Sequence, residues 1–90
     1  MQMFYKRLGY RSLWMDVETD IRRVVSDVSG LPPDADPQAD LYLDLGVASM
    51  HALQLLTQLE DHFGVSIPDD DFVQATSIAK LTSLVKGLSK

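Results

Sequence analysis

The chain contains no cysteine, which excludes disulfide bonds, cysteine-ligated zinc and a thiol nucleophile. It also lacks an apolar run near the roughly 18 residues that a membrane-spanning helix needs, and its first residues lack the apolar core of a secretory signal. Bases are scarce: 8 Lys and Arg face 13 Asp and Glu, giving a formal net charge of −5. This balance argues against nucleic-acid binding, which uses a basic face. We expect a cytoplasmic protein without a membrane span.

The length and the hydrophobic content of the chain fit one small domain. With 90 residues, of which 46% are hydrophobic, the chain can bury roughly 60% of its unfolded surface around a single core. Charge divides the chain in two: residues 1–14 carry three bases and no acid, and residues 15–90 carry the other five bases and all 13 acids. We expect a basic, aromatic N-terminal extension over 1–14, either a loosely docked terminus or an arm that binds a partner or touches a membrane, and a domain over 15–90.

The first part of the domain is predicted to be helical. Apolar residues recur at steps of three and four from Leu13 to Val28, which is typical of one face of an amphipathic helix. Ser12 is placed to cap the start of this helix. Gly30 ends it, and the two prolines that follow forbid its continuation.

A long loop is expected between this helix and the next. Residues 31–48 contain three prolines and four aspartates, a composition that argues against regular structure. We expect its leucines, Leu41, Leu43 and Leu45, to pin the loop to the core. A loop of this length in a small domain is usually functional or well packed.

Two longer helices and a short one are expected in the second half. From Ser49 to Gly64 apolar residues again recur at three or four positions: Met50, Leu53, Leu56, Leu59 and Phe63. Three acids at 69–71 indicate a short helix, because acids stabilise the positive end of a helix dipole. Thr76 and Ser77 are placed to cap a last helix.

The apolar positions of that last helix are Ile78, Leu81, Leu84, Val85 and Leu88. No alternating pattern of useful length predicts a strand. The sequence therefore predicts an all-α fold, a small four-helix bundle with three main helices and one short one, and a long loop between the first two helices.

The residues offer little for catalysis. His51 and His62 fall on the predicted helix that begins near Ser49, about three turns apart, and neither has a nucleophile to activate. Ser49 and His51 are too close in sequence to form a triad pair. We expect no enzyme and no dedicated metal site, and we expect both histidines to be solvated.

The strongest local pattern delivers a serine to a helix start. Residues 44–50 form a glycine-bearing loop that places Ser49 where backbone N–H groups are unpaired and the helix dipole is positive. A phosphate ester on this hydroxyl would be stabilised there. The other interpretation is a plain capping serine.

Further motifs extend the pattern over most of the chain. In order they are Leu45-Gly46 ahead of Ser49-Met50, then Leu59-Glu60 and Phe63, Ile67-Pro68-Asp69, and Thr76-Ser77-Ile78. Each motif is weak alone. Their joint spacing, which needs no gap from Leu45 onward, resembles the acyl carrier protein family over about residues 17–88.

The resemblance implies that Ser49 carries 4′-phosphopantetheine, added from coenzyme A by a phosphopantetheinyl transferase. The chain would then be a phosphoprotein that catalyses nothing and holds acyl, polyketide-type or aminoacyl intermediates as thioesters. Such cargo belongs to fatty acid, polyketide or nonribosomal peptide biosynthesis. The implied partners are an acyl- or aminoacyl-loading ligase and a downstream acyltransferase, synthase or condensing enzyme, and we expect a monomer.

Two positions beside the serine depart from the family pattern. Ala48 replaces the usual aspartate, which removes a carboxylate from the attachment site. This departure keeps an alternative open, an unmodified carrier-like interaction module. Met50 replaces leucine, a change of similar volume that we expect still to anchor the helix.

The helix after the serine is also low in acid. His51 and Gln54 stand at exposed positions where fatty-acid carriers have acids, so basic docking patches should fit it poorly. We expect a specialised, discrete carrier. The predicted docking residues are Met50, Leu53, Gln54 and Thr57, with Glu60 and Asp61 near the helix end.

Overall fold

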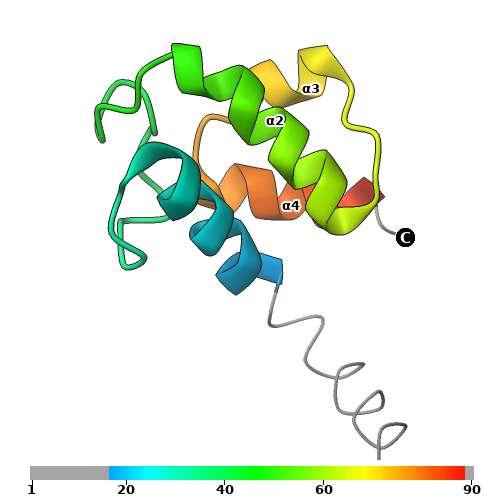
Figure 1. Ribbon diagram of the computed structural model, residues 1–90, viewed down its shortest axis with the longest axis horizontal. Coiled ribbons are helices and arrows are strands. Elements are labelled where there is room, and N and C mark those ends of the chain that lie inside the picture. Colours follow the sequence, from blue (N-terminus) through cyan, green and yellow to red (C-terminus); the bar gives the residue numbers. More distant parts are fainter. Residues whose placement is uncertain (1–16, 89–90) are drawn as a thin grey trace, which may run out of the picture.

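The structure is a computed structural model that describes residues 17–88 (Figure 1). This part folds into a helix over residues 17–29, α2 (Met50–Phe63), α3 (Asp69–Gln74) and α4 (Ile78–Leu88), and no strand occurs in it. The predicted all-α bundle, with its short third helix and long first loop, is confirmed. The extension over 1–14 and the cap at Ser12 lie outside the described residues.

A single core joins the four helices. Figure 1 shows the first helix (blue to cyan), α2 (green) and α4 (orange to red) gathered around it, with the short α3 (yellow) nearby. Its fully buried side chains come from the first helix, the long connection, α2 and α4: Ile21, Val25, Leu41, Leu59, Ile78, Leu81 and Val85. Within residues 17–88 no helix is both long and apolar enough to cross a bilayer.

Local sequence sets where α2 and α4 end and begin. Gly64 adopts φ 65°, a left-handed conformation that favours glycine, and its N–H donates to the Glu60 carbonyl at 2.9 Å. The Ser77 hydroxyl accepts the Lys80 N–H at 3.1 Å, which satisfies a first-turn donor of α4. The predicted helix end at Gly64 and the cap at Ser77 are both confirmed.

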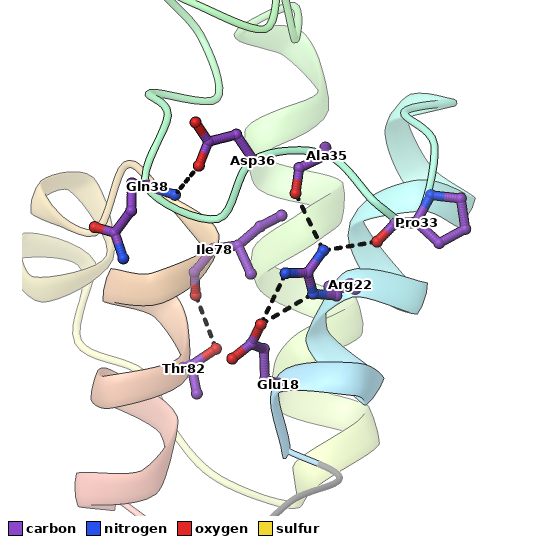
Figure 2. Close-up of polar contacts among 8 residues, drawn as sticks. All are labelled: Glu18, Arg22, Pro33, Ala35, Asp36, Gln38, Ile78 and Thr82. Atoms are coloured by element: carbon purple, nitrogen blue, oxygen red, sulfur yellow. Dashed lines mark hydrogen bonds and ion pairs between the residues drawn. The ribbon is translucent and has the colours of Figure 1, made fainter.

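The long connection over residues 30–49 is fastened to the first helix by an arginine. The Arg22 guanidinium donates to the carbonyls of Pro33 at 2.8 Å and Ala35 at 3.1 Å (Figure 2). Its Nε and Nη2 atoms donate to Glu18 at 3.0 and 2.8 Å. One side chain therefore gives two otherwise unpaired loop carbonyls a charged donor.

Backbone bonds fasten the rest of the connection to α4 and the segment before it. The Ala79 N–H donates to the Pro37 carbonyl at 2.9 Å, and the Leu41 N–H donates to Thr76 at 2.8 Å. The Leu41 carbonyl in turn accepts the Val47 N–H at 2.8 Å. These bonds fix the connection just before α2 begins.

The expectation that three leucines pin this connection is wrong for one of them. Leu41 is fully buried and Leu45 half-buried, but Leu43 is 86% exposed. The Asp40 carbonyl accepts the N–H groups of Asp44 and Leu45, as in a helical turn. Residues four apart then share a face, so Leu43 points away from Leu41 and Leu45.

Candidate functional site

The chain reaches α2 through a tight turn built on Asp40. The Asp40 carboxylate accepts the N–H groups of Tyr42 and Leu43, each at 2.9 Å. Gly46 then adopts φ 75°, which few other residues tolerate. Val47, 8% exposed, packs into the core directly before Ala48 and Ser49. The turn at Asp40 and the buried Val47 side chain therefore fix the backbone just before α2 begins.

Electrostatics reinforce this turn. The hydrogen bond from the Leu43 N–H, with smaller help from Tyr42, Thr76 and Lys80, lowers the pKa of Asp40 below its ordinary 3.8. Burial raises the pKa of Tyr42 above its ordinary 10.0, and the charge of Asp40 adds to this. The carboxylate that organises the turn is therefore the favoured form at neutral pH.

Ser49 occupies the N-cap position of α2 with its side chain exposed. Its backbone is helical (φ −62°, ψ −22°), and its side chain makes no capping hydrogen bond. The first-turn N–H groups of His51 and Ala52 bond instead to the carbonyls of Ala48 and Ser49, at 2.9 and 3.0 Å. The serine does not act as a plain cap, and these two N–H groups are not unpaired, contrary to the expectation from sequence.

This geometry fits a phosphodiester on the Ser49 oxygen. The hydroxyl is exposed to an incoming enzyme, and no capping bond is lost when it is substituted. The first turn of α2 contains no acid that would repel a phosphate. The positive end of the helix dipole also favours a negative group at this position.

An exposed row runs along α2 from the serine. The predicted docking residues Met50, Leu53, Gln54, Thr57 and Asp61 are all exposed, and Met50 and Leu53 are 78% and 71% exposed. The expectation that Met50 anchors the helix is therefore wrong. Met50 and the buried Leu59 are nine residues apart, which places them about 180° apart around a helix.

Glu60, the remaining docking candidate, is half-buried. Its carboxylate accepts the Ile67 N–H at 2.8 Å and so closes the segment between α2 and α3. Asp61 beside it is exposed. The two acids predicted as a pair are therefore in different environments, and Glu60 has a structural bond of its own.

The two histidines also differ, and the expectation that both are solvated holds only for His62. The His62 ring is exposed, with Nε2 3.3 Å from an Asp20 oxygen and an edge-to-face contact with Phe63. His51 is half-buried, and its Nδ1 atom is buried without a hydrogen-bond partner. One sequence signal points to this burial, since His51 lies four residues before Leu55, which is buried in α2.

The described residues contain no group of three or more His, Cys, Asp or Glu side chains that could hold a metal ion. Leu43 is a surface feature that the sequence pattern did not predict, because it was assigned to the core. Ser49 presents an exposed hydroxyl at the start of α2 that makes no capping hydrogen bond.

Comparisons with known proteins agree with this geometry. Residues 19–85 match the family model described as "Phosphopantetheine attachment site". An acyl carrier protein from Campylobacter hominis is 31% identical over 77 residues, covering 84% of this chain and 98% of the relative. The meromycolate extension acyl carrier protein of Mycobacterium leprae is 24% identical over 76 residues, covering 83% of this chain and 66% of the relative.

A solved structure shares the fold. The acyl carrier protein from Enterococcus faecalis superposes with a TM-score of 0.72 at 21% identity, covering 84% of this chain and 98% of that one. The likeness in structure extends over the same length as the likeness in sequence to the Campylobacter hominis protein.

Proposed function

This chain belongs to the acyl carrier protein family, and from that premise we propose that Ser49 is the residue that bears its arm. Members of the family are non-catalytic carriers in fatty acid or related synthesis. They hold a covalently attached 4′-phosphopantetheine, receive it from a phosphopantetheinyl transferase and interact with biosynthetic enzymes. What the proposal adds is the attachment residue, the docking surface and the class of cargo.

The observation that carries the proposal is the exposed, uncapped hydroxyl of Ser49 at the positive end of α2. In the transfer, the Ser49 oxygen forms a bond to the pantetheine phosphorus of coenzyme A. The diphosphate bridge breaks, adenosine 3′,5′-bisphosphate leaves, and the serine proton passes to a base on the transferase. The resulting phosphodiester keeps one negative charge, which the dipole of α2 favours.

Ala48 changes the charge at this site but not its access. The methyl side chain is exposed beside Ser49 and blocks no approach to the hydroxyl. Compared with an aspartate, it removes a carboxylate next to the phosphodiester and so removes a repulsion. It also removes a charge that a basic transferase could use for orientation.

The arm ends in a thiol, which is acylated to a thioester by a loading ligase. We place polyketide-type or aminoacyl cargo ahead of the fatty-acid intermediates of a housekeeping carrier, because the exposed row of α2 lacks acids in its first turns. Downstream, an acyltransferase, synthase or condensing enzyme takes the acyl group. A monomer and a cytoplasmic location stay predictions.

Partners are proposed to dock on the exposed row of α2: Met50, Leu53, Gln54, Thr57 and Asp61. Two large apolar side chains stand next to the attachment serine, and the acid comes only at the far end. Burying exposed apolar area stabilises a complex by about 25 cal/mol per Å². Partner binding should therefore depend more on apolar contact beside Ser49 than on charge.

Intact mass measurement tests the attachment. The purified protein is incubated with coenzyme A and a phosphopantetheinyl transferase of broad specificity, and we expect the mass of one phosphopantetheine to be added. Ser49→Ala should abolish the adduct. Ser83→Ala, at an exposed position of α4, is the matched control and should be modified normally.

The same experiment also separates the alternatives. Failure of several transferases to modify the wild-type chain would favour the unmodified interaction module. An adduct that persists on Ser49→Ala would place the arm on another residue. Protein purified from its own host in active growth should carry the arm.

A further inference from the structure

Large apolar side chains gather at the surface on both sides of Ser49 in the sequence. In the part of the chain that the structure describes, four of them are exposed: Leu43 by 86%, Met50 by 78%, Leu53 by 71% and Val73 by 70%. The first three lie within six residues of Ser49. A single exposed apolar residue is ordinary, but a group of them marks a contact surface. Leu43 is the member of this group that lies before the serine, outside α2.

The backbone around Leu43 is held by hydrogen bonds. Its own N–H donates to the Asp40 carboxylate at 2.9 Å. The N–H groups of Asp44 and Leu45 donate to the Asp40 carbonyl at 2.9 and 3.0 Å, and the Asp40 N–H donates to the Asp44 carboxylate at 2.9 Å. Leu41 and Leu45 make the core contacts of this segment. The turn therefore fixes a leucine that the core does not use, and a fixed side chain costs less entropy to bind.

Leu43 is also close enough to Ser49 to lie under the same partner. The Val47 N–H donates to the Leu41 carbonyl at 2.8 Å, which closes the segment that runs directly into the start of α2 (Figure 1). Through this bond the Cα atoms of Leu43 and Ser49 are at most about 18 Å apart. A standard interface covers about 800 Å² of each partner, a disc about 30 Å across. One partner can therefore cover both residues.

The chemistry of attachment selects which partner that is. A phosphopantetheinyl transferase must bring coenzyme A to the Ser49 oxygen itself, so it has to cover the surface around this residue. Enzymes that act on the cargo meet the far end of the arm and can stand further away. The first turn of α2 contains no acid, so the exposed groups next to Ser49 offer a partner apolar contact rather than negative charge.

We infer that Leu43 is a contact point for the phosphopantetheinyl transferase, which receives this side chain in an apolar recess while Met50 and Leu53 contact it from α2. The inference rests on the proposed function, with Ser49 as the attachment residue. Leu43 touches no reacting atom, and its contact is the same before and during the transfer. It therefore strengthens binding of the carrier and leaves the chemical step unchanged.

Steady-state kinetics of the transferase test this contact with two variants of similar size. Leu43→Gln makes the side chain polar, whereas Leu43→Met, the matched control, keeps it apolar. We expect Leu43→Gln to raise KM for the carrier about tenfold with kcat unchanged, because the lost contact contributes equally to the bound substrate and the transition state. Leu43→Met should keep KM within about twofold of the wild-type value.

Thermal unfolding of the same variants excludes an effect on the fold. Because Leu43 is 86% exposed, the Tm of both variants should stay within about 3 °C of wild type. A much larger fall in Tm for Leu43→Gln would show that Leu43 packs within the domain, and would overturn the inference.

The remaining outcomes separate this inference from the proposed function. An unchanged KM for Leu43→Gln, in protein that is modified normally at Ser49, would overturn the inference and leave the attachment residue intact. An equal rise in KM for Leu43→Met would also overturn it, because the apolar character would then not matter. A wild-type dimer that Leu43→Gln dissociates, measured by light scattering, would assign Leu43 to contact between two copies instead. Absence of modification at Ser49 in the wild-type chain would overturn both.

Discussion

The two ends of α2 differ in composition and in how neighbouring segments hold them. Its C-terminal end makes several contacts with other segments. The Glu60 carboxylate accepts the Ile67 N–H, the His62 ring contacts Asp20, and Gly64 turns the chain. Its N-terminal end presents Ser49 and Met50 to solvent. The contacts to other segments are therefore concentrated at the C-terminal end of α2, and its exposed surface lies beside Ser49, the proposed attachment residue.

The N-terminal end is nevertheless not loose, because the connection before it is anchored on its other side. Arg22 holds the loop carbonyls, the backbone of Leu41 bonds to Thr76, and Val47 is buried. Ser49 can therefore be exposed and still have a fixed backbone position, because the contacts that hold it are made by the connection that precedes α2.

The largest effect is expected from a leucine in the core-facing row. Leu59→Ala should lower the free energy of unfolding by about 2–5 kcal/mol, because Leu59 is fully buried and its removal leaves a cavity. Leu53→Ala, the matched change at a position 71% exposed, should stay within about 0.5 kcal/mol. Urea denaturation measures both. Equal losses would mean that Leu53 packs in the core after all.

The next effect concerns binding, and it acts at the N-terminal end. Met50→Glu should lower kcat/KM of the phosphopantetheinyl transferase about tenfold, because a charge replaces apolar contact beside Ser49. Asp61→Lys, a charge reversal at the other end of the exposed row, should change it less. A larger loss for Asp61→Lys would show that charge rather than apolar contact governs docking.

A smaller effect separates the two neighbouring acids. Glu60→Ala should destabilise the fold by about 1 kcal/mol, because the Ile67 N–H loses its carboxylate partner. Asp61→Ala is exposed and should stay within about 0.5 kcal/mol. Thermal unfolding measures the difference. Matching values would remove the structural role that we assign to Glu60.

The smallest effect is a pH dependence in the turn before α2. Because the folded pKa of Asp40 lies below its ordinary 3.8, its contribution to stability is complete above pH 3.8 and is lost as the pH falls through the folded value. Asp40→Asn should flatten this part of the curve of Tm against pH. Asp34→Asn, an exposed change in the same connection, should retain the wild-type slope.

The sequence predicted the elements well because their signals are local. Gly64 after the apolar run ends α2, and Ser77 caps α4 as expected, whereas Ser49 stands at the start of α2 without capping it. The long connection followed from its prolines and aspartates. The motif spacing led to the family, which the comparisons confirm over residues 19–85.

The site was predicted less completely, because which face of a helix is buried depends on its neighbours. Steps of three from Met50 to Leu59 rotate backwards around the helix by about 60° each. Both residues fit the same pattern in sequence, but only Leu59 meets the core. The same limit explains Leu43, which was expected to pack in the core and which a helical turn instead leaves exposed.

Local patterns were enough to predict the helix ends, the long loop and the serine at the start of α2, since caps, prolines and glycines act on their immediate neighbours. The packing of the helices was needed to show that Met50 and Leu43 are exposed, that the Glu60 carboxylate accepts a hydrogen bond, and that the Nδ1 atom of His51 is buried without a partner. Burial and pairing depend on segments that are distant in the chain, and no local pattern contains that information.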